Sequence, residues 1–566
     1  MISKTAMRET PVSMEMKPET AVEEVKRSSN FLRGTIAADL ENALPGVSNE
    51  SEQLLKFHGI YAQDNRDVRR ERSLKGETLD YIFMIRVAIP GGRLSTNQWL
   101  TLDRVSSDVA DGTIRLTTRQ AVQFHGVVKD GLRPLARAID RQLMTSFGAC
   151  GDVVRNLVSC PNLQSDASDE RLATITSTLA KSFRATTSAH WEIFVNGDKA
   201  ASRVDVEERP FYGDTYLPRK FKIAVAHPED NCVDVLAQDI GLIPGEDPEA
   251  GVGFTLLVGG GLGRSYAHDD TFARLADPMT FVTYDEVDEV IAAVLATYRE
   301  LGDRTDRKRA RMKYVVNDLG YEKFRKEIEV RLGRELREPL ALPEHFDGDD
   351  HLGWTSLRDG TLQLGVRVSA GRVRDDGSQR LRSALRRIAE TLTVTFFITA
   401  QQDILISQIP VAERGAVEAI LAEHAVRLNA ELGVVERTAL ACPALPTCAQ
   451  ALTEAERRLP ELVNTIEGEL GRRKLGRRSL QLRMTGCPNG CARPAVAEVG
   501  VVGRTKSTYD VYVGGGLRGD RLATLYREKV KFEEISIVLG PLFDRWENEG
   551  ESDEAFGDFV DRVGIE

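Results

Sequence analysis

The stretch Val153-Val-Arg-Asn-Leu-Val-Ser-Cys-Pro161 occurs a second time, in related form, as Val434-Val-Glu-Arg-Thr-Ala-Leu-Ala-Cys-Pro443. The cysteines of the two stretches, Cys160 and Cys442, stand 282 residues apart. Similarity at a fixed offset is the sequence signature of an internal duplication. We therefore expect two homologous halves in this chain.

Three further echoes occur in both parts of the chain in the same order. Two have offsets of 282 and 281 residues, and the third is a strand-like segment that ends in three glycines. The pairs are Leu116-Thr-Thr-Arg-Gln120 with Ile398-Thr-Ala-Gln-Gln402, Ile85-Arg-Val87 with Val366-Arg-Val368, and Leu256-Leu-Val-Gly-Gly-Gly261 with Val511-Tyr-Val-Gly-Gly-Gly516. Strand-like segments alternate with amphipathic helical ones, which predicts an α+β fold. We expect a site at the pseudo-twofold interface between the halves.

The composition is typical of a globular chain with several domains. The 566 residues exceed one ordinary core, and 42% of them are apolar while 28% are charged. A net charge of −11 argues against a nucleic-acid partner, since phosphate binding requires a basic face. We find neither an apolar stretch of about 18 residues nor an N-terminal secretory signal. We therefore expect no membrane contact and a cytoplasmic location.

Four of the seven cysteines form a pattern. Five residues separate Cys442 from Cys448, three separate Cys487 from Cys491, and 38 lie between the two pairs. Four thiolates suit either one zinc ion or an iron–sulfur cubane. Zinc knuckles usually space their cysteines by two or four residues, whereas Pro and Gly here can turn N–H groups toward inorganic sulfide. The spacing favours a [4Fe-4S] cluster over structural zinc or unliganded core cysteines.

This pattern resembles a known family. C-x5-C followed by Thr485-Gly-Cys-Pro-Asn-Gly-Cys491 is the signature of nitrite and sulfite reductases that couple a siroheme to a [4Fe-4S] cluster. The resemblance runs from about residue 30 to the C-terminus. It is also carried by Lys56-Phe-His-Gly-Ile-Tyr61, Gly112-Thr-Ile-Arg115, Leu217-Pro-Arg-Lys-Phe-Lys222, Leu256 to Leu262, Gly302-Asp-Arg-Thr-Asp-Arg-Lys308 and Gly557-Asp-Phe559.

The resemblance implies a duplicated sulfite/nitrite reductase repeat with pseudo-twofold symmetry and three domains around siroheme and the cluster. The expected segments are an N-terminal arm with a partner-docking segment (1–80), ferredoxin-like halves of both repeats (81–148 and 347–429), a first siroheme-binding domain (149–346) and a second domain that binds siroheme and the cluster (430–566). Within the arm, a short helix is expected to dock the partner through the apolar residues Phe31, Leu32, Ile36 and Leu40.

The resemblance also assigns the cysteines and a cationic substrate site. Cys442, Cys448, Cys487 and Cys491 are expected to ligate the cluster, and Cys491 also to be the axial ligand of the siroheme iron. Each S–O bond that breaks needs its oxygen protonated or neutralised, which requires cationic hydrogen-bond donors. The residues that match the family's positions are Arg86, Arg155, Lys220 and Lys222. Nearby, the chain carries Gly151 and Val154 where relatives can carry asparagine.

Siroheme carries eight carboxylates, so its pocket should be unusually basic. The expected contacts are Arg115, Arg119, Gln123, His125, Arg219 and Lys308, and Gly259, Gly260 and Gly261 are expected to let the backbone approach siroheme or the repeat partner. Gly514-x-Gly516-x-x-Gly519 matches a dinucleotide fingerprint, but a lone match is weak. We expect close backbone approach there rather than NADPH binding.

The implied function is six-electron reduction of sulfite to sulfide, in sulfate assimilation and cysteine biosynthesis. Assimilatory nitrite reduction on the same scaffold is the alternative within the class, and a non-catalytic zinc protein is the alternative outside it. The chain has no segment left over for a flavin module. Electrons are therefore expected from a partner, either a flavoprotein that carries FAD and FMN and oxidises NADPH, in a hetero-oligomer, or ferredoxin.

Overall fold

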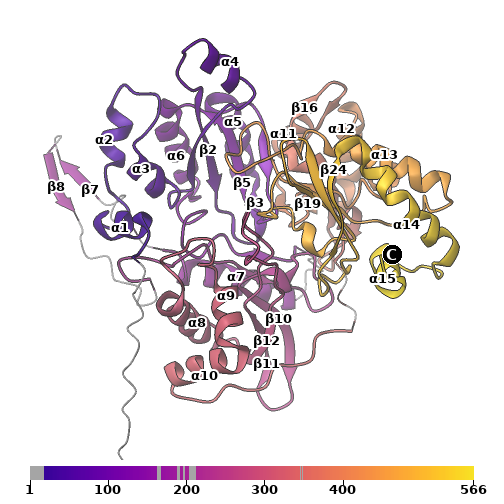
Figure 1. Ribbon diagram of the computed structural model, residues 1–566. Helices are drawn as coiled ribbons and strands as arrows, with labels where there is room; N and C mark the ends of the chain where they lie inside the picture. The colour runs from indigo at the N-terminus through magenta and orange to yellow at the C-terminus, as the bar shows by residue number, and fades with distance from the viewer. Residues whose placement is uncertain are drawn as a thin grey trace, which may run out of the picture.

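Four five-stranded sheets form the framework of the described chain, two in each half. The computed structural model describes residues 18–161, 167–185, 187, 192–195, 198–202, 212–344, 346 and 348–565. In Figure 1 the N-terminal half fills the left and lower parts of the view, and the last part of the chain, in orange and yellow, lies on the right. The sheets define the two halves that the repeat predicted.

Two of the sheets have the same topology. Their strand orders are β12-β11-β10-β9-β6 and β24-β23-β22-β21-β20. In each sheet three strands run parallel, and the last two along the chain are added antiparallel. The strands are β6 Val158–Ser159, β9 Ile223–Val225, β10 Ile240–Asp247, β11 Gly251–Val258, β12 Asp277–Thr283, β20 Leu440–Ala441, β21 Leu482–Thr485, β22 Val499–Gly503, β23 Thr508–Val513 and β24 Thr524–Lys531. A separate hairpin joins β7 Glu192–Val195 to β8 Asp198–Ser202.

The other two sheets exchange a strand between the halves. The sheet β1-β2-β5-β4-β15 ends in a strand of the second half, and the sheet β13-β14-β19-β18-β3 ends in a strand of the first half. The strands are β1 Ile60–Asp64, β2 Tyr81–Val87, β3 Arg93–Ser95, β4 Ile114–Leu116, β5 Val122–Val127, β13 Gly353–Ser356, β14 Leu362–Val366, β15 Arg372–Val373, β18 Thr395–Ile398 and β19 Ile404–Ile409. One core covers both sheets, with Trp99 stacked on Phe396 at 5.0 Å.

Three large hydrophobic cores mark three domains. Around the interlocked sheets pack α5 Thr96–Val109, α6 Leu132–Asp140, α11 Leu381–Thr391 and α12 Arg414–Glu423. On the first repeat's other sheet pack α7 Ala167–Ser182, α8 Val287–Leu301, α9 Met312–Leu319 and α10 Tyr321–Leu332. On the second repeat's other sheet pack α13 Leu459–Arg472, α14 Ile535–Glu549 and α15 Phe556–Val563. The predicted α+β fold with duplicated halves and three domains is confirmed.

The described part of the N-terminal segment packs on the body of the protein. It contains α1 Ala21–Ser28, α2 Ile36–Glu41, α3 Asn49–Leu55 and α4 Arg69–Leu74. Leu32 is fully buried, and Ile36 and Leu40 pack on the chain's own cores. This corrects the expectation that these apolar side chains face a partner. Residues 1–17 of the predicted arm lie outside the described residues, and docking by the segment stays a prediction.

A buried ion group anchors α1. Lys26 lies 2.7 Å from Glu23 and 3.7 Å from Asp152, and its ammonium donates to Leu217 O at 3.0 Å. Asp152 also pairs with Arg307 at 2.9 Å. Because buried charges need partners, α1 is part of the folded body next to the segment that carries Lys220 and Lys222.

Glu456 joins the two halves at an exchanged strand. It lies 3.0 Å from Arg115 on β4 and 2.7 Å from Arg372 on β15. Burial raises the pKa of Glu456, but the two guanidinium groups outweigh it and hold the pKa at about 2, below the ordinary 4.5. The ionised carboxylate therefore stabilises the fold above pH 4.5 by about 3 kcal/mol, and this contribution is lost as the pH falls toward 2.

Glu456→Gln should lower the thermal unfolding midpoint at pH 7, through a loss of about 3 kcal/mol, because two buried guanidinium groups lose their counter-charge. The difference should shrink as the pH falls below 4.5, where the unfolded carboxyl takes up its proton. Circular dichroism melts at pH 7 and at acid pH measure both effects. Glu533→Gln is the control, since Glu533 is 70% exposed and lies 3.4 Å from Arg458. Equal shifts in both variants would contradict the assignment.

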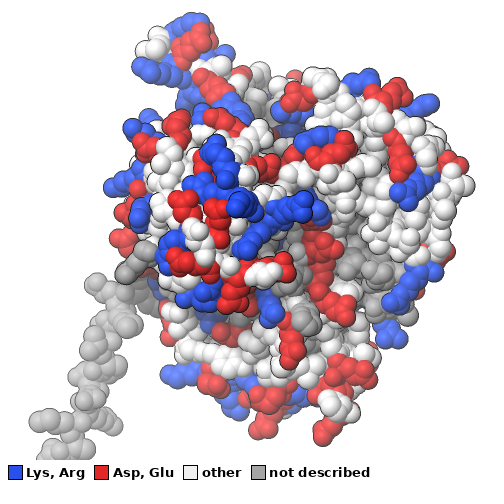
Figure 2. Space-filling view, turned by 90° about the vertical axis from the view of Figure 1, so that its right-hand side faces the viewer, with Lys and Arg blue, Asp and Glu red and all other residues white. Residues whose placement is uncertain are grey.

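The surface mixes charges of both signs. On the face that Figure 2 shows, Lys and Arg side chains are interspersed with Asp and Glu. This face therefore lacks the single-sign basic field that binds nucleic acid. None of the described helices is long and apolar enough to cross a membrane.

Candidate active site

The four patterned cysteines gather at the ends of two neighbouring parallel strands. Cys442 directly follows β20, and Cys487 follows β21 after one residue. Because β20 and β21 pair in parallel, both strands deliver their cysteine to the same sheet edge. Cys448 and Cys491 complete the group from the turns that follow. Burial, and after it the nearby Cys491 thiol, raises the pKa of Cys442 well above its ordinary value and that of Cys487 to about 12.

The spacing of these sulfur atoms fits a group larger than one ion. Among the described residues, these four cysteines do not form a group that could hold a single metal ion. A tetrahedral zinc ion with bonds of about 2.3 Å holds its sulfur ligands about 3.8 Å apart. Backbone and amide N–H groups also point at the sulfur atoms, from Gly486 N to Cys442 at 3.3 Å and from Asn489 Nδ2 to Cys487 at 3.5 Å. The donor set therefore fits a [4Fe-4S] cluster.

The loop that carries Cys487 and Cys491 is fixed by the first half of the chain. Arg264 N donates to Pro488 O at 2.9 Å, and Thr118 Oγ1 donates to Cys491 O at 3.0 Å. Thr118 belongs to the turn between β4 and β5, next to Arg119. The interface between the repeats thus brings Cys491 beside the predicted basic residues, as the duplication implied.

Arg86 and Arg155 lie on either side of a buried thiol. Arg86 Nη1 donates to Cys150 Sγ at 2.9 Å. With its amide oxygen turned toward the guanidinium, Gln123 accepts from Arg86 across the β2–β5 pairing. Burial lowers the pKa of Arg155, while Tyr61 and Cys150 raise it, and the net shift is upward. Arg155 therefore stays charged, and the chain places both arginines near Cys150.

Lys220 and Lys222 lie close to the same group. Burial and the nearby cations Arg155, Arg311 and Arg219 lower the pKa of Lys220 to about 7, while Cys491 acts in the opposite direction. Burial and then Lys220 hold the pKa of Lys222 well below its ordinary value. An anion that enters this group would relieve the repulsion and draw protons onto both lysines. This arrangement of half-buried cations can therefore bind an oxyanion with proton uptake.

The predicted siroheme contacts Arg115, Arg119 and Arg219 are also buried or half-buried. Arg119 Nη1 donates to Gln238 Oε1 at 2.9 Å, whereas its buried Nε makes no hydrogen bond with the described residues. Burial and then Arg155 lower the pKa of Arg119 to about 9. Arg219 lies 3.6 Å from Asp152. Such an accumulation of buried positive charge fits a cofactor rich in carboxylates.

Arg115 contacts the second half of the chain directly. Its Nη2 donates to Ala441 O, beside Cys442, at 2.7 Å, and its Nε to Glu456 at 3.0 Å. Burial lowers the pKa of Arg115 to about 10. The geometry gives this residue a structural role between the halves in addition to any contact with a cofactor.

His125 and Lys308 differ from the rest of the predicted set. His125 is buried, neither ring nitrogen makes a hydrogen bond with the described residues, and burial lowers its pKa to about 3. It is therefore a neutral ring with free polar atoms, which suits a cofactor contact. Lys308 contacts His268 at the exposed surface, and none of its described contacts joins it to the basic group.

The triple glycine allows a close approach within its own half. A Cβ at Gly260 would lie 2.3 Å from Leu236 O, and one at Gly515 would lie 2.3 Å from Ala497 O. Gly519 instead faces the first repeat, where a Cβ would lie 3.0 Å from Asp234 Oδ1, so approach to the repeat partner is confirmed at that glycine. Contact with siroheme stays a prediction. The segment after Gly514–Gly519 continues into strand β24 rather than a helix. The dinucleotide fingerprint is thereby excluded.

Three further residues belong to this basic group, although the sequence assigned them no role in it. Cys150 and Tyr61 lie beside Arg86 and Arg155, and burial followed by Cys150 raises the pKa of Tyr61. Arg311 pairs with Asp239 at 2.9 Å and acts on both lysines. Tyr61 ends a stretch that carries the family resemblance, whereas Cys150 and Arg311 belong to no such stretch. Only the folded chain brings the three together at this site.

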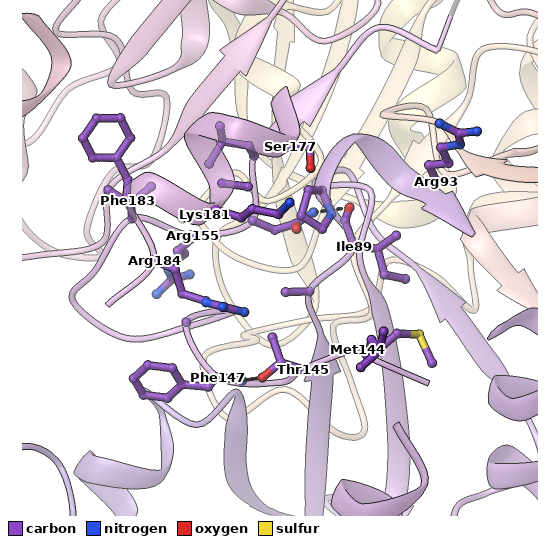
Figure 3. A pocket seen from close by; sticks show the side chains of 18 of the residues that line it. Ile89, Arg93, Met144, Thr145, Phe147, Arg155, Ser177, Lys181, Phe183 and Arg184 are labelled. Carbon is purple, nitrogen blue, oxygen red and sulfur yellow. Dashed lines mark hydrogen bonds between the residues drawn. The ribbon is translucent and has the colours of Figure 1, made fainter. Parts of the chain in front are cut away.

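A pocket of about 320 Å³ opens beside Arg155. Figure 3 shows Lys181 and Arg184 around it together with Arg155, while Phe147 and Phe183 provide apolar walls. With Arg93, four cations line this one pocket and extend the positive field of the basic group toward solvent. The pocket is therefore suited to the approach of small anions.

The chain belongs to the nitrite and sulphite reductase family. The model of the nitrite and sulphite reductase 4Fe-4S domain matches residues 176–336 and 434–566, and that of the nitrite/sulfite reductase ferredoxin-like half domain matches residues 75–142. The resemblance predicted from the cysteine pattern is confirmed.

Among its relatives are three sulfite reductases. The sulfite reductase (NADPH) hemoprotein beta-components of Geobacillus thermodenitrificans and Myxococcus xanthus are both 41% identical, over 97% and 98% of this chain and 96% and 98% of theirs. The sulfite reductase (ferredoxin) of Synechococcus elongatus is 39% identical over 96% of this chain and 89% of its own. In structure, the Mycobacterium tuberculosis NirA protein matches with a TM-score of 0.77 and 25% identity, over 97% of both chains.

Proposed function

We propose that this protein reduces sulfite to sulfide at a single site. The full-length similarity to proteins named sulfite reductase supports the substrate. The observation that carries the proposal is the hydrogen bond from Thr118 Oγ1, next to Arg119, to Cys491 O at 3.0 Å, because it joins the basic group to the cysteine loop. A cationic oxyanion site therefore adjoins the cysteine at which the two cofactors would meet.

The residues that would hold the cofactors are those described above. Cys442, Cys448, Cys487 and Cys491 would ligate a [4Fe-4S] cluster, with Cys491 shared with the siroheme iron, and Arg115, Arg119, Arg219 and His125 would contact the siroheme. When bound, these cofactors supply the electrons for the reduction. The chain itself must bind the oxyanion, orient it and provide protons.

Those tasks fall to two arginines and two lysines. Arg86 and Arg155 would fix the orientation of the oxyanion with their planar guanidinium groups. Lys220, with a pKa of about 7, can gain a proton when an anion binds and release it when an oxygen leaves as water. Lys222 shares the neighbour Arg311 with Lys220, and its pKa is shifted in the same direction. Each S–O cleavage then has a charged donor at hand.

The electron donor is proposed to be a separate flavoprotein subunit that oxidises NADPH, in a cytoplasmic hetero-oligomer that serves sulfate assimilation and cysteine biosynthesis. Two of the three relatives above carry NADPH in their names, and the third carries ferredoxin.

The test is sulfide formation from sulfite by the purified holoprotein. With a reduced viologen, we expect sulfide and a higher kcat/KM for sulfite than for nitrite. With NADPH and the flavoprotein, turnover should exceed that with reduced ferredoxin. Higher kcat/KM for nitrite would overturn the substrate, and turnover with ferredoxin alone would overturn only the donor.

A further inference from the structure

A second group of potential metal ligands lies in the first repeat, apart from the four patterned cysteines. It consists of Cys160, Asp230, Cys232 and His351, and the ligand atoms of all four lie within 4.8 Å of one another. The side chains are almost completely buried, with 3% exposure for His351 and 4% for Asp230. Two thiols, a carboxylate and an imidazole that converge in the interior form a donor set typical of zinc.

The position of this group in the repeat is informative. Cys160 directly follows β6, as Cys442 directly follows β20. Cys232 stands two residues before Asp234, a left-handed residue that begins the short helical turn Val235–Ala237. Cys491 stands two residues before Arg493, which is left-handed and begins the equivalent turn Pro494–Val496. The group thus occupies the place in the first repeat that the cluster cysteines occupy in the second.

The hydrogen bonds around the group leave one ligand atom of Asp230 and one of His351 for its centre. Asp230 Oδ1 accepts from Cys232 N at 2.7 Å and from Asp349 N at 3.3 Å. Asp230 Oδ2 instead lies 3.3 Å from both Cys160 Sγ and His351 Nε2. The buried Nε2 makes no hydrogen bond of acceptable geometry with the described residues.

Residues outside the group contact the atoms of His351 and Cys232 that do not face its centre. His351 Nδ1 lies 3.8 Å from the carboxylate of Asp349, which favours the tautomer that leaves Nε2 free to bind a metal. Gln401 Nε2 donates to Cys232 O at 2.9 Å. Gln401 follows β18 in the second half, and His351 immediately precedes that half's first strand, β13. The group therefore joins segments from both repeats.

We propose that Cys160, Asp230, Cys232 and His351 bind one structural divalent ion, with zinc as the preferred metal. Four protein ligands close the coordination sphere, so the ion has no open position for chemistry. Its role is to connect the end of β6 in the first repeat to the segment that precedes β13 in the second half. Where the second repeat would hold a cluster for electron transfer, the first would hold an ion for stability.

The test is the metal content of the complete holoprotein, expressed with zinc and iron both supplied and purified without strong chelator. Mass spectrometry of metals should find about one zinc per chain in addition to iron. X-ray absorption at the zinc edge, which iron does not obscure, should show two sulfur ligands at about 2.3 Å and two nitrogen or oxygen ligands at about 2.0–2.2 Å.

Two variants and a control complete the experiment. Cys232→Ser and His351→Gln should each lose most of the zinc, keep the iron, and lower the thermal unfolding midpoint. His424→Gln should keep the zinc, because the buried His424 lies outside the group and contacts Ile420 O. Three results would overturn the proposal: zinc below about 0.1 per chain in the unchanged protein, a zinc shell without sulfur, or a disulfide between Cys160 and Cys232.

Discussion

Replacing Cys491 with serine should abolish sulfite reduction and disturb both cofactors at once. Cys491 lies near Cys442 and Cys487, and its carbonyl oxygen accepts a hydrogen bond from Thr118, next to Arg119, at 3.0 Å. It therefore adjoins both the cluster ligands and the basic group. A serine oxygen is a harder ligand than a thiolate and binds iron of such clusters less well. Activity with a reduced viologen should fall below detection, with loss of iron and a changed siroheme absorption.

Asn489→Ala is the matched control for this prediction. Its amide lies 3.5 Å from Cys487 Sγ in the same loop, but it supplies no ligand. We expect this variant to keep its iron and a siroheme spectrum close to that of the unchanged protein. A Cys491→Ser protein with full iron content and full activity would show that Cys491 does not connect the cofactors.

Lys222→Asn should lower kcat/KM for sulfite by roughly ten- to a hundred-fold, and that for nitrite much less. Sulfite presents three oxygens and up to two negative charges, whereas nitrite presents two oxygens and one charge. Lys222 lies beside the cations Lys220, Arg119 and Arg311, which repel its charged form. A ligand with more negative charge offsets more of this repulsion. A buried charge-assisted hydrogen bond contributes about 1.5–3 kcal/mol, and each 1.4 kcal/mol is about a factor of ten.

Initial rates with both substrates and one chemical reductant measure this selectivity. Lys326→Asn is the control, because Lys326 is 66% exposed on α10, and both rates should stay unchanged. Equal loss for the two substrates in Lys222→Asn would make Lys222 a general proton donor or siroheme contact. The preference for sulfite would then need another residue to explain it.

The duplication could be predicted from the sequence because it has strict local requirements. Cys160 and Cys442 mark the ends of equivalent strands, and Gly260 and Gly515 face carbonyl oxygens so closely that no side chain fits. The exchange of β3 and β15 could not be predicted. These strands have three and two residues, too few for an alternating pattern, and tertiary packing selects their partners.

Only those residues of the site that belong to recognisable motifs could be predicted from the sequence. The spacing of the four cysteines pointed to a cluster, and the resemblance placed Arg155, Lys220 and Lys222 near it. Cys160 and Cys232 belong to no spaced ligand motif, and their partners Asp230 and His351 come together only in the folded chain. Likewise, the sequence marks Leu32 only as an apolar residue suited to docking, and the folded chain shows that it is buried.

The proposed function requires that a single site reduce sulfite completely to sulfide. The most direct measurement is the electron count: reduced viologen consumed per sulfide released by the holoprotein at limiting sulfite. We expect six electrons per sulfide and complete conversion, because Arg86, Arg155, Lys220 and Lys222 would retain the oxyanion until its last oxygen leaves. Release of partly reduced sulfur species, or viologen consumption without sulfide, would contradict it.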